Sequence, residues 1–242
     1  MEYQTALKVV EIFLTDIVNY LSIFLYLILA ELKGEMIMEV PMQLLIPNNL
    51  ENLQLPSPEL LTYYRNLEER VIWIDYGVDE SILEVSKLIM YFNKEDKGVP
   101  VEQRKPIKLL LYSYGGDGQA CFSLLDMIAL SKTPVHTINM GVAMSAGLLI
   151  LLAGHKRFCL KNSTALAHSG SGGASGTFEQ TEAQMKDYKR FVDTMRNYII
   201  EQTNIDTKTL NKYKNKEWYL YSEDQVKYGI VNKIIDDIDE IL

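Results

Sequence analysis

The sequence has few of the residues that form disulfides, bind metals or carry acid–base chemistry, with two cysteines and three histidines among 242 residues. Cys121 and Cys159 lie in apolar stretches with no C-x-x-C or Cys/His spacing, which excludes a disulfide scaffold and a zinc site and fits a reducing cytoplasm. Basic residues are also scarce, because 24 Lys and Arg face 32 Asp and Glu. The net charge of −8 argues against a general nucleic-acid binder. We therefore expect a cytoplasmic protein with no metal and no cofactor.

Hydrophobic residues are abundant, and their first long run lies near the N-terminus. Residues 12–30 read IFLTDIVNYLSIFLYLILA, interrupted by Asp16 and Asn19. The remaining charge-free stretch is shorter than the roughly 20 apolar residues that cross a bilayer. No basic start of a signal peptide precedes it. Three interpretations stay open: a docking or interfacial helix, a membrane anchor, or an upstream start codon before a protein that begins at Met36 or Met38.

The overall composition, 48% hydrophobic and 23% charged, is typical of one globular domain. We assign residues 1–59 to the apolar helix and an extended arm, and residues 60–242 to the domain. Short apolar runs there alternate with helical patterns, which predicts an α/β fold with a largely parallel, covered sheet. The expected strands are 71–75, 108–114, 136–140, 156–160 and 165–168, and the expected helices are 80–93, 118–131 and a segment after Ser145.

A long helix is predicted at about 177–203. Thr177 and Gln180 have the spacing of a capping box at its start. At about 1.5 Å per residue the helix is longer than a domain of this size needs, so we expect it to project. Its apolar stripe then needs a partner, which favours self-association over packing on its own domain. The stripe consists of Phe191, Met195 and Ile199.

The search for a general base is short because of the small number of histidines. His136 and His155 lie at strand ends and are interpreted as structural. His168 differs, since it ends an apolar strand and precedes the glycine-rich stretch SGSGGASG. Catalytic groups of α/β domains often occupy such strand ends beside loops.

Ser145 lies in GVAMSAG at the expected start of an apolar helix. The helix N-terminus would stabilise negative charge there, and the N–H of Ala146 would be a free donor. The alternative is an ordinary N-cap serine. Upstream, a strand ends in Gly115 and Gly116, where a second N–H donor could approach. Nucleophile, base and oxyanion donors together indicate acyl transfer. The residues alone do not select an acid that would orient the histidine.

The stretch from 108 to 176 resembles ClpP, the proteolytic subunit of the ATP-dependent Clp protease. KLLLYSYGGDG is similar to the strand and Gly-Gly turn of that family, and TINMGVAMSAGLLILLAG to its nucleophile helix. KRFCLKNSTALAHSGSGGASG is similar to the segment with the catalytic histidine. The similarity continues through the long helix, the family's handle, to EWYLYSEDQVKYGIVNKI, and so covers about residues 64–235.

This resemblance implies a crotonase-like ClpP fold and a set of site residues. Ser145 would be the nucleophile, His168 the base, and the N–H groups of Gly116 and Ala146 the oxyanion donors. Glu217 would be the triad acid, where the family usually has aspartate. The implied substrate-binding residues are Gly115, Ser169, Gly170, Ser171, Gly172 and Gly173.

Two further departures concern the same site. Tyr114 replaces the family's usual proline before Gly-Gly, and Gly170 replaces a proline two residues after the histidine. Glycine at that position adds flexibility, which weakens the preorganisation expected of the substrate-binding strand.

The resemblance implies an ATP-dependent Clp-type serine endopeptidase subunit, which acts in protein quality control on unfolded polypeptides inside a chamber. Seven-membered homo-oligomeric rings would pair into a double ring, and because such a chamber admits only unfolded chains, an AAA+ unfoldase is implied as partner. The chain has no P-loop, so it would not supply the ATP hydrolysis itself. Two alternatives remain: an ATP-independent ClpP-like peptidase of phage-maturation or membrane-associated type, and a non-catalytic ring subunit.

Overall fold

The computed structural model describes residues 58–241. The predicted apolar helix and most of the extended arm lie outside these residues, so the three interpretations of the N-terminal run remain predictions. Within the described part, no helix combines the length and apolar character needed to cross a membrane.

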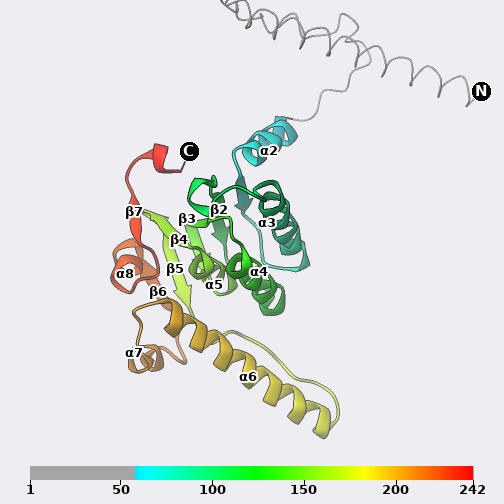
Figure 1. Cartoon of the computed structure of the whole chain (residues 1–242). Helices are drawn as coiled ribbons and strands as arrows, with labels where there is room; N and C mark the ends of the chain where they lie inside the picture. The colour runs from blue at the N-terminus through cyan, green and yellow to red at the C-terminus, as the bar shows by residue number, and fades with distance from the viewer. Residues whose placement is uncertain (1–57, 242) are drawn as a thin grey trace, which may run out of the picture. The chain divides into compact units, whose positions relative to one another are not determined.

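One mostly parallel sheet forms the framework of the domain (Figure 1). Its main path runs β1-β2-β3-β4-β7, and all neighbours on this path are parallel. A branch leaves β3, where β5 pairs in parallel and β6 pairs antiparallel with β5 at the edge. The strands are β1 Val71–Ile74, β2 Ile107–Ser113, β3 Val135–Met144, β4 Lys156–Leu160, β5 Thr164–Ala167, β6 Trp218–Tyr221 and β7 Lys233–Ile235.

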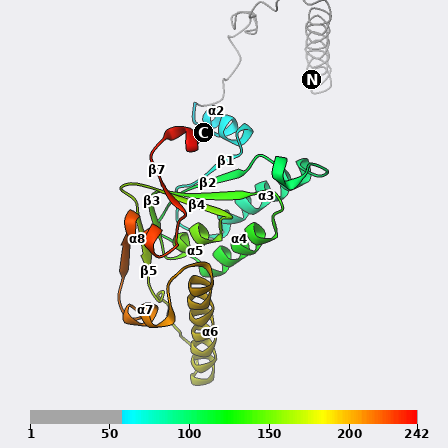
Figure 2. The ribbon, with the colours of Figure 1, turned by 60° about the vertical axis from the view of Figure 1, so that its left-hand side comes forward.

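Helices α3, α4 and α5 pack on one another against one side of this sheet (Figure 2). The predicted α/β class is confirmed, and every element predicted between 71 and 168 is present, β4 with its predicted bounds and the others with shifted ends. The α-helices are α2 Pro58–Glu68, α3 Leu83–Glu95, α4 Gly118–Leu130, α5 Ala146–Ala153, α6 Phe178–Gln202, α7 Thr207–Lys212 and α8 Ser222–Lys227. Short 3₁₀ turns are η3 Glu80–Ile82, η4 Val101–Gln103 and η5 Ile238–Glu240.

Strand β3 is longer than its predicted core, 136–140, because it changes partner along its length. As far as Asn139 it pairs with β4, and from Val142 it pairs with β5. Its register with β2 shifts in the same interval, from Leu111↔Asn139 to Ser113↔Ala143. This bulge separates the sheet into a main path and the β5–β6 branch.

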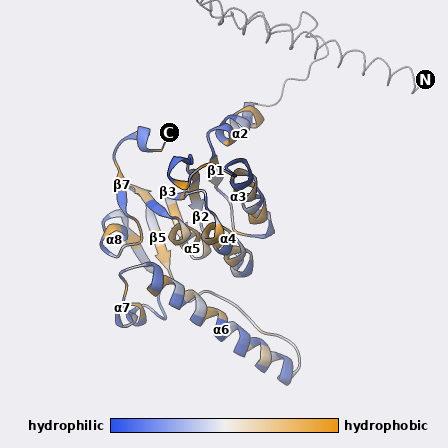
Figure 3. Cartoon of the chain, in the orientation of Figure 1, coloured by the Kyte–Doolittle hydropathy of each residue, from blue (hydrophilic) through white to orange (hydrophobic). Residues whose placement is uncertain are grey.

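Helix α5 is apolar on all sides and is enclosed by the sheet and by α4 (Figure 3). Every residue from Ala146 to Leu152 is buried. A helix without a polar face is stable only inside a core, where each buried leucine contributes about 1.5–3 kcal/mol. The N-terminal end of α5 is therefore held by the core itself.

Helix α6 has 25 residues and extends away from the sheet (Figures 1 and 2). Thr177 caps it, and the predicted capping box with Gln180 is present. Its start is polar, and Phe178 and Met185 are 78% and 51% exposed. Both the length and the projection of the helix agree with the prediction.

The apolar stripe on α6 was predicted to be covered by a second chain, but it packs against the core of its own domain. Ile199 is buried in the core, Met195 packs against it, and the Phe191 ring lies 5.4 Å from that of Phe122. Gly118 makes this contact possible, because a Cβ there would lie 2.1 Å from the Phe191 ring. The stripe packs on its own domain, so it gives no independent argument for self-association.

Candidate active site

Ser145 occupies a sharp turn between β3 and α5. Its backbone has φ 54° and ψ −121°, and only one other non-glycine residue in the described part, Arg70, has positive φ. Such a conformation is strained and is retained where surrounding structure enforces it, often at functional sites. The N–H of Ser145 donates to the carbonyl of Leu166 at 3.0 Å, which fixes the turn to β5.

The Ser145 side chain is engaged by a histidine. Its Oγ lies 2.7 Å from Nε2 of His168, which follows directly after β5. The side chain makes no N-cap bond to α5, so the alternative of an ordinary capping serine is wrong. A hydroxyl hydrogen-bonded to an imidazole is the arrangement of an activated nucleophile with its general base.

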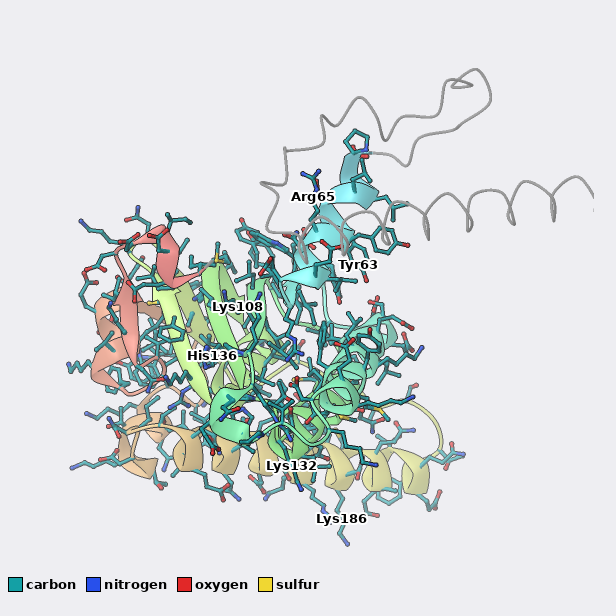
Figure 4. The ribbon with its side chains drawn as sticks, turned by 45° about the horizontal axis from the view of Figure 1, so that its top comes forward. Tyr63, Arg65, Lys108, Lys132, His136 and Lys186 are labelled. Carbon is teal, nitrogen blue, oxygen red and sulfur yellow. The ribbon has the colours of Figure 1, made fainter. Side chains whose placement is uncertain are left out.

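The two other histidines have structural roles, as expected from their positions. His155 accepts a hydrogen bond from the Val135 N–H through Nδ1 at 2.8 Å. His136 pairs in register with Lys108 on the sheet (Figure 4). Burial, with the nearby charge of Lys156, lowers the pKa of His136 to about 4. Neither histidine contacts Ser145.

The Gly115-Gly116 turn lies directly against the Ser145 turn. A Cβ on Gly115, which has φ 97°, would lie 2.7 Å from the Ser145 Cβ and 3.0 Å from the Ala146 nitrogen. A Cβ on Gly116 would lie 2.1 Å from the Val78 carbonyl oxygen. Both positions therefore require glycine, as close backbone approach does in general.

The hydrogen bonds of this turn omit two N–H groups beside the serine. Val78 donates to the Gly115 carbonyl at 2.9 Å and accepts from the Asp117 N–H at 2.7 Å, which leaves the Gly116 N–H out of the pairing. Ala146 is the first residue of α5, so its N–H has no acceptor within the helix. Both groups have the character of oxyanion donors.

Ser113 is a supporting residue that the sequence interpretation missed. Its hydroxyl is buried, donates to the Tyr76 carbonyl at 2.7 Å and accepts from the Gly115 N–H at 3.3 Å. The one sequence signal for this role is a serine at the end of the otherwise mostly apolar strand β2. Its role became visible only with the position of the turn.

Glu217 lies across from His168 but does not contact it. The β5–β6 register pairs Ala167 with Trp218, so one further step places His168 opposite Glu217. The exposed carboxylate instead accepts a hydrogen bond from the Tyr219 hydroxyl at 2.7 Å, which raises the pKa of that tyrosine. Among the described side chains, the hydrogen bond of His168 is to Ser145 alone. The structure thus brings serine and histidine together and leaves the predicted acid turned away.

Comparison with known proteins identifies the family. The Clp protease family model matches residues 58–237. The chain belongs to the Clp protease family. The predicted resemblance to ClpP is confirmed. As a member of this family, the chain belongs to a family of peptidases, which are hydrolases.

Similar curated proteins are proteolytic subunits of Clp proteases. The ATP-dependent Clp protease proteolytic subunit 2 of Treponema denticola is 36% identical over 54% of this chain and 66% of its own length. The proteolytic subunit 2 of Treponema pallidum is 32% identical over 74% of this chain and 89% of its own. The subunit of Deinococcus radiodurans is 29% identical over 74% and 86%.

In this Clp family member, the predicted substrate-binding segment is a loop between β5 and α6. Within the described structure, the backbone of residues 169–173 makes no hydrogen bond to other backbone groups. The loop lies over α6, where a Cβ on Gly172 would be 2.8 Å from the Tyr188 ring. Ser169 is anchored by donating its hydroxyl to the Lys214 carbonyl. An unpaired backbone segment can bind an extended peptide by strand addition.

A pocket opens beside the Ser145 and His168 side chains of this Clp family member. Its cationic residues, Arg196 and Lys214, come from α6 and the segment after α7. Its free volume is about 20 Å³, room for roughly one water, so a peptide side chain enters only if the lining moves. The apolar lining includes Leu148, Leu149, Leu166, Met195, Ile199 and Trp218.

The cysteines offer no competing nucleophile. Both are buried and free, and burial raises the pKa of Cys121 to about 12, which keeps this thiol protonated at neutral pH. Among residues 58–241, no group of three or more His, Cys, Asp or Glu side chains is placed to hold a metal ion.

Proposed function

We propose that this Clp family member is a serine endopeptidase in which Ser145 attacks a peptide carbonyl while His168 takes its proton. The tetrahedral oxyanion forms beside the N–H groups of Gly116 and Ala146. His168 then protonates the leaving amine, and water, activated by the same histidine, hydrolyses the acyl-enzyme. The observation that carries this proposal is the 2.7 Å contact between Ser145 Oγ and His168 Nε2.

Glu217 is the proposed acid of this triad. Its position supports the role, because Glu217 and His168 are the next residues beyond the last β5–β6 pair, Ala167 with Trp218, and opposed residues lie about 5 Å apart at Cβ if the pairing is extended by one step. To act, the carboxylate leaves the Tyr219 hydroxyl and accepts from Nδ1 of His168. It would then hold the imidazole orientation and stabilise the imidazolium.

The proposed substrate is an unfolded polypeptide bound in extended form. Its backbone pairs with the unpaired segment 169–173, and an apolar side chain lies over the mouth of the narrow pocket lined by Met195 and Trp218. Gly115 lets the peptide approach the serine closely, since no side chain stands there. The proposed contacts are Gly115, Ser169, Gly170, Ser171, Gly172 and Gly173.

The proposed assembly follows the relatives, whose names describe them as proteolytic subunits of an ATP-dependent protease. We extend to this chain the heptameric double ring, the AAA+ unfoldase partner and a cytoplasmic location. A second candidate function is a non-catalytic ring subunit, which the separation of Glu217 from His168 favours.

The deciding experiment is hydrolysis of a fluorogenic peptide by the purified full-length chain, together with labelling by a fluorophosphonate probe and measurement of the assembly mass. We expect Ser145→Ala to lower hydrolysis by about 10⁵- to 10⁶-fold and to abolish labelling. Ser123→Ala, an exposed serine on α4, is the matched control and keeps both. A ring that neither cleaves nor reacts with the probe would establish the non-catalytic alternative.

A further inference from the structure

Asn139 and Gln225 form a buried amide pair at the point where β3 changes partner. Both side chains are 0% exposed. Nδ2 of Asn139 donates to Oε1 of Gln225 at 3.2 Å. Buried amides are retained without penalty only where each polar atom has a partner, so the remaining contacts of the pair indicate what it holds.

Asn139 joins the bulge of β3 to the start of β5. Its Nδ2 also donates to the Thr164 carbonyl at 3.2 Å, and its Oδ1 accepts from the Gly141 N–H at 3.1 Å. The side chain therefore replaces ladder hydrogen bonds at the place where the ladder is interrupted. It fixes the angle at which the second half of β3 departs.

Gln225 joins α8 to both strands of the branch. Its Nε2 donates to the Ser163 carbonyl at 3.2 Å, just before β5, and to the Leu220 carbonyl at 3.1 Å, within β6. Together the two amides touch β3, β5 and β6. These are the strands whose ends carry Ser145, His168 and Glu217.

We propose that the Asn139–Gln225 pair is a positioning device that sets the ends of β3, β5 and β6 relative to one another, and with them the contact between Ser145 and His168. The inference rests on the proposed peptidase function. Neither side chain touches the reacting atoms. The pair acts through the backbone it holds, because the strands leave the amide cluster and reach the site within a few residues.

The competing explanation is that the pair only stabilises the fold. Two variants separate the explanations: Gln225→Met, and the double variant Asn139→Leu with Gln225→Met, which replaces both amides by apolar groups of similar size. Removal of both side chains leaves no orphaned amide between them, but their backbone partners, such as the Gly141 N–H and the Leu220 carbonyl, lose a hydrogen bond, so both variants should be less stable than wild type. The matched control is Thr133→Val, since this buried hydroxyl donates to Asp96 at 2.7 Å away from the site.

The test measures kcat, KM and the thermal unfolding midpoint with the full-length chain and a fluorogenic peptide. We expect Gln225→Met to lower kcat about 10- to 100-fold with KM little changed, since sub-ångström to 1 Å misplacement has effects of this size. The double variant should lower kcat at least as much as Gln225→Met, whereas Thr133→Val should lower the midpoint and leave kcat unchanged. Recovery of wild-type kcat in the double variant would overturn the proposal.

A second measurement keeps this inference separate from the proposed function. Hydrogen exchange of the Ser145 N–H reports its bond to the Leu166 carbonyl and needs no activity. If wild type neither cleaves peptide nor reacts with fluorophosphonate, the proposed function fails, and exchange still decides the positioning role. Faster exchange at Ser145 in both amide variants than in Thr133→Val supports it, and equal exchange rejects it.

Discussion

The two sides of the site are held in different ways. Ser145 lies between a buried strand and a buried helix, and its backbone strain is sustained by contacts with Gly115 and Leu166. Glu217 precedes β6, the edge of the sheet, and its exposed carboxylate is held by a neighbouring tyrosine. The nucleophile is fixed by packing, whereas the acid is fixed by one exposed hydrogen bond.

This difference shows which part of a catalytic arrangement a fold can determine by itself. Burial over the whole of α5 leaves the serine turn no alternative position. A side chain on an edge strand has several rotamers of similar energy, and an exposed hydrogen bond of about 1 kcal/mol selects among them. The histidine, at the end of a central strand, takes its position with the serine.

Gly115→Ala should have the largest effect, because it disturbs the backbone turn that holds Ser145. The added methyl group meets the Met144 carbonyl and the Ser145 Cβ at 2.7 Å, and the φ of 97° disfavours alanine. We expect peptide hydrolysis to fall by about 100-fold or more, because the serine turn must move. Gly77→Ala is the control, since its methyl group meets an ordinary contact at 3.6 Å. Equal rates for the two variants would contradict the rigid-turn account.

Loss of the Glu217 carboxylate should lower activity less than disturbance of the Ser145 turn does. Glu217→Gln removes the carboxylate charge, and we expect kcat to fall about 10- to 30-fold, well below the roughly 10⁴-fold reported for a buried triad aspartate changed to asparagine. Glu182→Gln, on the exposed part of α6, serves as the control. Rates for Glu217→Gln equal to this control would remove Glu217 from the mechanism.

Tyr219→Phe sharpens the comparison by releasing the acid. Without the hydroxyl, the Glu217 carboxylate loses its 2.7 Å partner and is free to turn to His168. We expect kcat to rise about two- to threefold, consistent with removal of an exposed hydrogen bond. A pH–rate profile of wild type and variant measures this, and a lower kcat in the variant would mean that Tyr219 orients the acid instead.

A smaller effect, confined to stability, concerns His136 on the sheet. Its folded pKa of about 4 lies below the unfolded value near 6.5, chiefly because of burial and secondarily because of Lys156. The stability that it contributes is complete above about pH 6.5 and is lost as pH falls towards about 4, since the unfolded chain binds the proton first. His136→Gln should flatten this part of the profile in urea unfolding between pH 7 and 5. An unchanged slope would contradict the prediction.

Much of the fold was predictable from local pattern. Strand β2 is a mostly buried run that ends before a Gly-Gly turn, and α6 carries its own capping signal. The start of α3 was shifted because a 3₁₀ turn precedes it, and β3 was underestimated because no local pattern marks a change of partner.

The site was predictable in part for the same reason. Ser145 and His168 each stood at the junction of an apolar run and a glycine-rich turn, which is a local signal. The contacts of Ser113, Asn139 and Gln225 depend on segments up to 86 residues apart, and no spacing in the chain indicates them. The orientation of Glu217 is a rotamer preference, which sequence does not encode at all.

The projecting helix α6 is anchored at one end only, so a small tilt of the helix displaces its free end. Its C-terminal half is anchored to the core through Phe191 and Ile199, and its free start is joined to His168 by the loop that runs back along it (Figure 1). Over the roughly 20 Å of helix between Phe178 and Phe191, a tilt of about 5° moves the tip by about 1.7 Å. Such a tilt would displace one end of the loop whose other end is joined to His168, the same loop that we propose for substrate.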